Sequence, residues 1–247
     1  PDGLPFKENQ QYESLDQLFT RRNLIALAWL MEAIEKEPHR DLRDFLKIAF
    51  TSMVHLCSRM IPAIDPTPGS HQTSFSSTWS QHSYWHAPNH MEQNVWEKFE
   101  SAVTGHQGLQ KAKEESNSFF HEIEFGRGVE DVLKGKADVY IHCGDALDLT
   151  QSMTEQYGPC VDYIFTDPPY DASVQYGELA YLWVSWLKKD DGYLDQLLAK
   201  EVVRNERQHK PFEIYQSLLS NAFRCMHDVL KPNGYLTLTF HNPTFKV

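Results

Sequence analysis

The residues best suited to chemistry directly follow the apolar run 161–166 and stand four in a row: Asp167, Pro168, Pro169 and Tyr170. The β-branched and aromatic residues of that run predict a buried central strand. Two successive prolines cannot donate hydrogen bonds to a sheet, and each disfavours helical geometry in the residue before it. We therefore expect a stiff, extended segment at the carboxyl end of the strand, where open α/β sheets bind ligands.

This segment combines a carboxylate, main-chain carbonyl groups and an aromatic ring, which suits chemistry on an exocyclic amine. Such an amine is a poor nucleophile because its lone pair is delocalised into the base. Oxygen acceptors for its two hydrogens, here the Asp167 carboxylate and the Pro168 carbonyl, would free that lone pair for attack. Tyr170 would hold the extruded base by stacking, since chemistry on a base requires it to leave the duplex. The alternative is a rigid turn with no catalytic role.

The Asp-Pro-Pro-Tyr sequence at 167–170 resembles the catalytic motif of amino-group DNA methyltransferases, which use S-adenosylmethionine and mostly form N6-methyladenine. Val-Gln-Tyr and Glu-Leu at 174–179, before an aromatic-rich helix at 180–187, resemble more specifically the large prokaryotic adenine-specific DNA methylases that carry a zinc ribbon. The resemblance covers about residues 15–60 and 137–243. It implies an α/β fold, namely a partial Rossmann-like methyltransferase core with an N-terminal helical region, and a place in a restriction-modification or phage-defence system.

The resemblance also implies roles for particular residues. Asp167, Pro168, Pro169 and Tyr170 would be catalytic, and Asp167 would also lie near the cofactor. Gly-Asp-Ala at 144–146 stands where the family places the adenine of S-adenosylmethionine, so Asp145 would bind the adenine amino group beside the main chain of Ala146. Tyr170, Gln175 and Tyr176 would contact the target base or its flanks. The structural alternatives are a helix N-cap for Asp145 and a core position for Tyr176.

Several predicted elements would position these residues. A strand at 137–143, an amphipathic segment and the strand at 161–166 together predict a βαβ unit with a right-handed crossover. Periodic apolar residues predict a helix at 214–230, ended by the Lys-Pro-Asn-Gly turn at 231–234 and followed by a strand at 235–241. We therefore expect a partial methyltransferase core over residues 131–247.

Residues 1–130 are predicted to form a helical region with a polar insert. Helices are expected at 21–37, capped by Thr20, at 41–61 and at 92–123, separated by a Ser-, His- and Trp-rich stretch that starts at residue 62. Three histidines in that stretch are spaced by four residues: His82, His86 and His90. Pro88 interrupts any helix that would align them and no carboxylate is an obvious partner, so no metal is expected.

A Gly-rich turn after a first strand, which this class of cofactor site requires, is not found in the sequence. We therefore expect a fragment that holds the catalytic half, with the Gly-rich segment on the remainder of a longer polypeptide. The alternatives are methylation of cytosine N4, RNA or a protein glutamine, and a methylase-like DNA-binding or assembly module without activity. The missing turn favours the module, whereas the intact motif favours an adenine-specific enzyme.

Composition sets further limits. The formal net charge of −11 argues against strong non-specific DNA binding, which depends on phosphate neutralisation. The one extended basic cluster, at 204–210, is interpreted as a solvated loop. The four scattered cysteines contain no close pair for zinc, and no apolar run is long enough to span a membrane, so we expect a cytoplasmic protein with reduced thiols.

Overall fold

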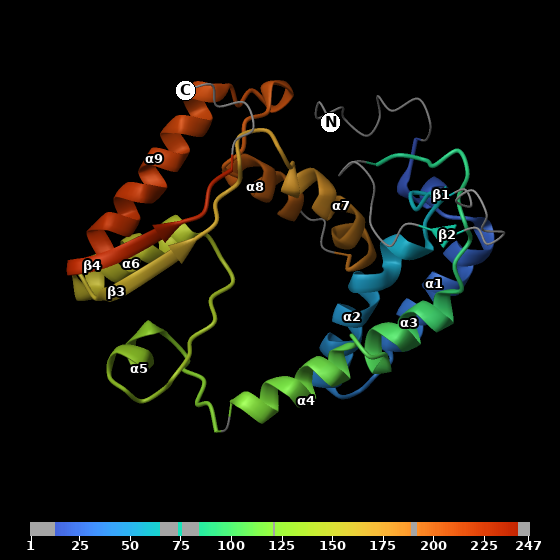
Figure 1. Cartoon of the computed structure of the whole chain (residues 1–247), viewed down its shortest axis with the longest axis horizontal. Helices are drawn as coiled ribbons and strands as arrows, with labels where there is room; N and C mark the ends of the chain where they lie inside the picture. Colours follow the sequence, from blue (N-terminus) through green and yellow to red (C-terminus); the bar gives the residue numbers. More distant parts are fainter. Residues whose placement is uncertain (1–12, 65–73, 76–83, 121, 189–191, 242–247) are drawn as a thin grey trace, which may run out of the picture. The chain divides into compact units, whose positions relative to one another are not determined.

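The computed structural model describes residues 13–64, 74–75, 84–120, 122–188 and 192–241 (Figure 1). The chain forms two compact units. One unit, the helical unit, comprises Pro1–Phe119 and Tyr176–Lys200, and the other, the sheet unit, comprises Phe120–Gln175 and Glu201–Val247. The sequence predicted one boundary, at residue 130. It did not predict that residues 176–200 belong to the helical unit.

The helical unit contains short 3₁₀ turns, longer α-helices and one antiparallel pair of two-residue strands: η2 (Leu15–Leu18), α1 (Arg21–Glu35), α2 (Arg40–Met53), η3 (Val54–Cys57), β1 (Ala63–Ile64), β2 (Ser74–Phe75), α3 (Val95–Thr104), α4 (Leu109–Phe119), α7 (Tyr176–Trp186) and α8 (Tyr193–Lys200). The side chain of Thr20 accepts a hydrogen bond from the main-chain N–H of Asn23, which confirms the predicted cap of α1. The helix expected at 41–61 ends at Met53 and tightens into η3.

The single helix expected at 92–123 is wrong, because two glycines separate α3 from α4. A Cβ on Gly108 would lie 2.8 Å from the carbonyl oxygen of Val103, and one on Gly105 would collide with the carbonyl of Ser101. The chain therefore turns here through a close approach of main-chain atoms that only glycine permits.

Helix α7 is built into the core of the helical unit. The Trp183 indole N–H donates to the Thr51 carbonyl at 2.9 Å, and the Trp186 ring meets Phe19 edge-on at 5.9 Å. The Tyr84 hydroxyl accepts from the Leu182 N–H at 2.8 Å and donates to the Leu179 carbonyl at 3.0 Å. Trp183 and Trp186 thus pack against the core, and Tyr84 anchors α7.

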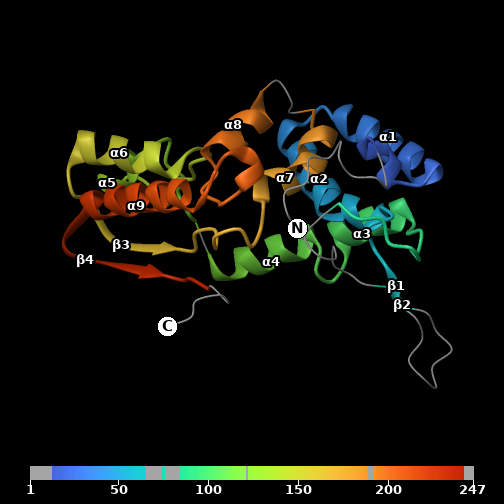
Figure 2. The same cartoon turned by 90° about the horizontal axis from the view of Figure 1, so that it is seen from above.

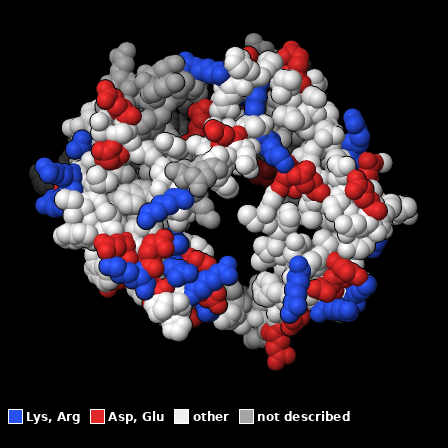
Figure 3. Space-filling view, turned by 180° about the vertical axis from the view of Figure 1, so that it is seen from behind, with Lys and Arg blue, Asp and Glu red and all other residues white. Residues whose placement is uncertain are grey.

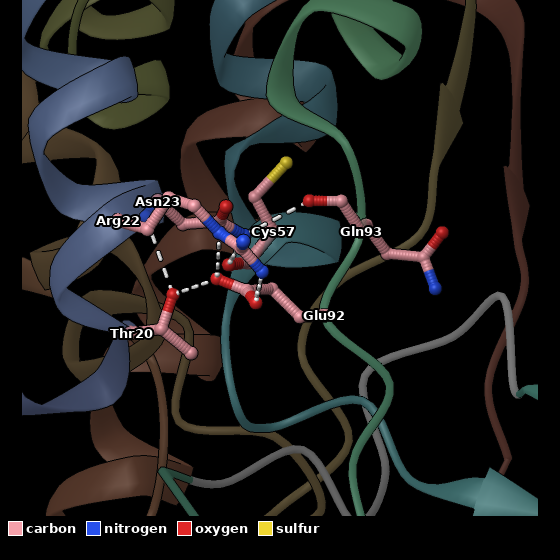
Figure 4. A network of polar contacts seen from close by, with 6 residues as sticks. All are labelled: Thr20, Arg22, Asn23, Cys57, Glu92 and Gln93. Atoms are coloured by element: carbon pink, nitrogen blue, oxygen red, sulfur yellow. Dashed lines mark hydrogen bonds and ion pairs between the residues drawn. The ribbon is translucent and has the colours of Figure 1, made fainter.

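A polar network at the start of α1 closes one end of this core (Figure 4). The buried Asn23 amide donates at 3.0 Å to the carbonyls of Cys57 and Gln93. Thr20 and Arg22 both bind the Glu92 carboxylate, and their hydrogen bonds lower the pKa of Glu92. Burial raises the pKa of the Cys57 thiol to about 12. Asn23 therefore joins α1 to two segments that are distant in sequence.

The sheet unit contains two parallel strands with helices on one side: α5 (Val129–Leu133), α6 (Ala146–Tyr157), β3 (Val161–Thr166), η5 (Glu206–Gln208), α9 (Phe212–Val229) and β4 (Leu230–Leu238). Figure 2 shows α6 and α9 on the same side of β3 and β4. Helix α9 runs directly into β4, close to the predicted boundaries. In the described residues this sheet has two strands, so the fold is mixed α/β.

The Lys-Pro-Asn-Gly turn at 231–234 lies within β4 as a bulge. Val161 pairs with Leu230, whereas Tyr163 pairs with Tyr235, so the register shifts across these residues. A Cβ on Gly234 would lie 3.1 Å from the carbonyl oxygen of Asp162, which explains glycine at this close approach of two strands.

Two sequence predictions for this unit are wrong. Residues 137–143 are not a strand: they make one isolated bridge, between Phe125 and Val139, because their main chain bonds to residues 124–126 instead of to β3. The predicted βαβ unit is therefore not formed. Strand β3 is also not a buried central strand, since none of its six residues is buried and Tyr163, Phe165 and Tyr235 expose large aromatic surface.

No helix within the described ranges combines the length and the apolar character needed to cross a membrane.

Candidate functional site

The Asp-Pro-Pro-Tyr segment lies at the carboxyl end of β3, as the sequence predicts. The Asp167 side chain is exposed, and the Tyr170 hydroxyl donates a hydrogen bond to its Oδ1 atom. This hydrogen bond lowers the pKa of the Asp167 carboxyl below its ordinary value. Asp167 is therefore an ionised acceptor at neutral pH, as binding of an amine requires.

Two aromatic residues that follow β4 surround Tyr170. The ring of Phe240 meets that of Tyr170 edge-on with centroids 5.5 Å apart, and His241 lies similarly at 6.4 Å. The Thr239 N–H donates to the Thr166 carbonyl at 3.1 Å, so the hydrogen bonding to β3 continues past the end of β4 at Leu238. Sequence reasoning missed both rings as site residues, although they stand at the end of the predicted strand at 235–241 and that strand lies parallel to β3.

The two proline carbonyls of the motif have different surroundings. The Pro169 carbonyl accepts from the hydroxyl of Tyr215 at 3.0 Å, and the Asp171 N–H donates to the same hydroxyl at 3.2 Å. In the part of the chain that the structure describes, no donor lies within hydrogen-bond distance of the Pro168 carbonyl. Asp167 and Pro168 thus present two adjacent hydrogen-bond acceptors. The sequence analysis expects this pair to accept the two hydrogens of an exocyclic amine.

A loop at 201–211 packs against the chain that follows the motif. The Arg204 Nε atom forms an ion pair with Asp171 Oδ1 at 2.9 Å, and the Arg204 N–H donates to the Asp171 carbonyl at 3.2 Å. The Asn205 amide donates to Gln175 Oε1 at 2.9 Å, and the Gln175 amide donates back to the Arg204 carbonyl at 3.1 Å. These contacts fix residues 171–175 in place.

The interpretation of 204–210 as a solvated loop is wrong for two of its polar residues. Asn205 and Lys210 are buried, and the Lys210 ammonium donates to the Glu201 carbonyl at 2.9 Å, with burial lowering its pKa. Gln175, expected at the target base, is also only 7% exposed and has both ends of its amide bonded within the loop. The polar residues of this cluster satisfy each other and the main chain, which local sequence does not reveal.

The other expected site residues lie at helix starts. Asp145 is the N-cap of α6, since its side chain accepts a hydrogen bond from the Leu147 N–H at 2.9 Å. This is the structural role that the sequence offered as the alternative to cofactor binding. The Asp145 residue is half-buried. Ala146 is exposed as the first residue of α6. Tyr176 begins α7 in the helical unit and is 52% exposed, which is not a core position.

Within the sheet unit, the structure brings Asp167, Pro168, Pro169 and Tyr170 together. In Figure 1, α6 starts near the carboxyl end of β3, the end of the strand that the motif follows. The described residues contain no group of three potential metal ligands; His82, the first of the three spaced histidines, lies outside the described residues.

Charged side chains of both signs intermingle on the face shown in Figure 3.

In comparisons with family models, curated proteins and solved structures, the chain matches none.

Proposed function

We propose that this protein is the catalytic part of an adenine-specific DNA methyltransferase that transfers a methyl group from S-adenosylmethionine to the N6 amine of adenine. One observation carries the proposal: an ionised, exposed carboxylate at Asp167 stands next to the unbonded Pro168 carbonyl, with Tyr170 beside them. An amine that is delocalised into a base needs two such acceptors to become nucleophilic.

In this mechanism the chain binds and orients the base. Asp167 and the Pro168 carbonyl accept the two amine hydrogens, which localises the lone pair on nitrogen, and the ring of Tyr170 stacks on the extruded base. To bind the amine at Oδ1, the base must displace the Tyr170 hydroxyl that occupies this atom in the structure. The methylated cation that results loses its proton readily, so no general base with a tuned pKa is required.

The residues present fit one end of S-adenosylmethionine, which would supply a methyl group on a positively charged sulfur. Asp145 offers a half-buried carboxylate for the adenine amino group, beside the main chain of Ala146. No Gly-rich turn after a strand occurs in the described residues to receive the methionine end. The proposal therefore includes a longer polypeptide that carries such a turn, with DNA as substrate and a restriction-modification or phage-defence system as the setting.

The proposal is tested by measuring transfer of a labelled methyl group to duplex DNA, to RNA and to DNA without adenine. The assay uses the chain and, in parallel, a longer polypeptide with a Gly-rich segment. We expect transfer to adenine-containing DNA that falls at least a hundredfold in Asp167→Ala, because this carboxylate contacts the reacting amine; each tenfold corresponds to about 1.4 kcal/mol of barrier.

The matched control is Asp162→Ala on the same strand. Asp162 is exposed and pairs with Lys231 at 2.8 Å, an interaction that contributes little to stability, so activity should be retained. Transfer of the labelled methyl group to RNA or to cytosine would show that the substrate is not adenine in DNA. DNA binding without turnover in either polypeptide, and unaffected by Asp167→Ala, would instead establish a non-catalytic DNA-binding module.

A further inference from the structure

The hydroxyl of Tyr215 is the point at which α9 contacts the candidate catalytic motif. Tyr215 lies in the first turn of α9 and is only 4% exposed. Its hydroxyl donates to the Pro169 carbonyl at 3.0 Å and accepts from the Asp171 N–H at 3.2 Å. One atom therefore joins the peptide groups on both sides of Tyr170.

The residue held in this way has an unusual main-chain conformation. Asp171 has a φ of 53°, in the left-handed region that residues with a Cβ rarely adopt. Its N–H bonds to Tyr215, its carbonyl accepts from the Arg204 N–H, and its carboxylate pairs with Arg204 Nε. Three contacts from outside the motif thus compensate the strain at Asp171 and end the extended segment at a defined point.

This arrangement also distinguishes the two proline carbonyls. Because the Pro169 carbonyl is bonded to Tyr215, the Pro168 carbonyl is the one left to face a ligand beside Asp167. Without the Tyr215 hydroxyl, the Pro169 carbonyl and the Asp171 N–H would each lose a hydrogen-bond partner, whereas the Tyr170 carbonyl, which accepts from the Ser173 N–H at 2.9 Å, would keep one. The Pro168 acceptor, which is linked to the Pro169 carbonyl through the rigid Pro169 ring, and the Tyr170 ring would then be held less firmly.

We propose that Tyr215 is a positioning residue for methyl transfer: its hydroxyl fixes the peptide groups on both sides of Tyr170 and so orients the Pro168 carbonyl and the Tyr170 ring toward the target base. The inference rests on the proposed function, which it deepens. Tyr215 acts through the motif and does not itself touch the base.

The test is Tyr215→Phe, which removes one oxygen and keeps the buried ring, with Tyr235→Phe as the matched control. Tyr235 is a largely exposed tyrosine of β4 outside the site. We expect faster hydrogen exchange at the Asp171 amide in Tyr215→Phe, with exchange in β3 unchanged. We also expect kcat to fall roughly tenfold, the loss of about one hydrogen bond in the transition state, while KM for S-adenosylmethionine is unchanged.

The outcomes separate this inference from the function on which it rests. If transfer depends on Asp167 but Tyr215→Phe retains the wild-type kcat, the positioning role is overturned and the proposed function stands. Unchanged exchange at Asp171 would overturn the inference as well, because the hydroxyl would then not hold this peptide. If no polypeptide that contains the motif transfers a methyl group, the proposed function fails, and the positioning role fails with it.

Discussion

Asp167 and Tyr170 interact directly, and this contact determines how the motif can bind an amine. The Tyr170 hydroxyl donates to the Asp167 carboxylate, which lowers the pKa of Asp167. The hydrogen bond keeps the acid ionised and holds the tyrosine ring next to it. Under the proposed function, a base that replaces the hydroxyl would meet an acceptor that is already charged and oriented.

We predict that Tyr170→Phe raises the pKa of Asp167 toward its ordinary value, because the first cause of the lowered pKa is removed. A carboxyl with a lowered pKa contributes stability above its unfolded-state pKa, and the contribution is lost as the pH falls through the folded-state pKa. Wild type should therefore keep Asp167 ionised to lower pH than the variant. Carboxyl carbon NMR titration measures this difference.

The exposed Tyr163 on β3 offers a control for that titration, since Tyr163→Phe should leave Asp167 unchanged. An identical Asp167 titration in Tyr170→Phe and wild type would show that the hydroxyl does not act on the carboxylate. In transfer assays, Tyr170→Phe retains the ring that stacks on the base, so it should lose less activity than Tyr170→Ala.

At the scale of elements, polar side chains join helices to segments far along the chain. Asn23 on α1 donates to the carbonyls of Cys57 and Gln93 (Figure 4). In the same way, Tyr215 on α9 donates to the motif after β3. In both cases a helix supplies a rigid base, and one buried polar group satisfies two main-chain partners. Such contacts place loops that have no regular structure of their own.

Asn23→Ala should lower the free energy of unfolding of the helical unit by about 2–3 kcal/mol, because two hydrogen bonds are lost and buried carbonyls remain unsatisfied. Urea titration followed by tryptophan fluorescence would measure the change, since Trp183 lies in this unit. Asn117→Ala on the exposed surface of α4 is the matched control and should change stability by less than about 0.5 kcal/mol. Equal effects of the two substitutions would contradict the structural role of Asn23.

At the scale of the whole molecule, charge limits the attraction to DNA that the proposed function would require. The sequence carries a formal net charge of −11, and acidic and basic residues are mixed on the face shown in Figure 3. Attraction to phosphate groups would therefore contribute little, and under the proposed function affinity would come from contacts with an extruded base.

We predict weak binding of this chain to duplex DNA of arbitrary sequence, with a dissociation constant above about 10 µM at roughly 0.15 M salt. The affinity should depend only weakly on salt, because few phosphates are neutralised. Fluorescence anisotropy at several salt concentrations measures both quantities. Tight binding with a steep salt dependence would reveal a concentrated basic surface and contradict this prediction.

The sequence by itself determined the features that depend on neighbouring residues. Apolar periodicity located α1 and α9, the Thr20 side chain capped α1, and β3 ended at Thr166, just before the Asp-Pro-Pro segment. It also identified Asp167 and Pro168 as adjacent acceptors, because their proximity follows from the covalent chain. These local preferences act within a few residues, so they can be read without a fold.

Only the tertiary structure decided the features that depend on distant partners. Residues 137–143 have strand-like composition but pair with residues 124–126, and a strand forms only where a partner completes its ladder. Helix α7 packs into the helical unit through the hydrogen bonds of Trp183 and Tyr84. The hydrogen bonds of Tyr215 and the burial of Gln175 arise from chain segments tens of residues away. Their geometry exists only after folding has brought those segments together.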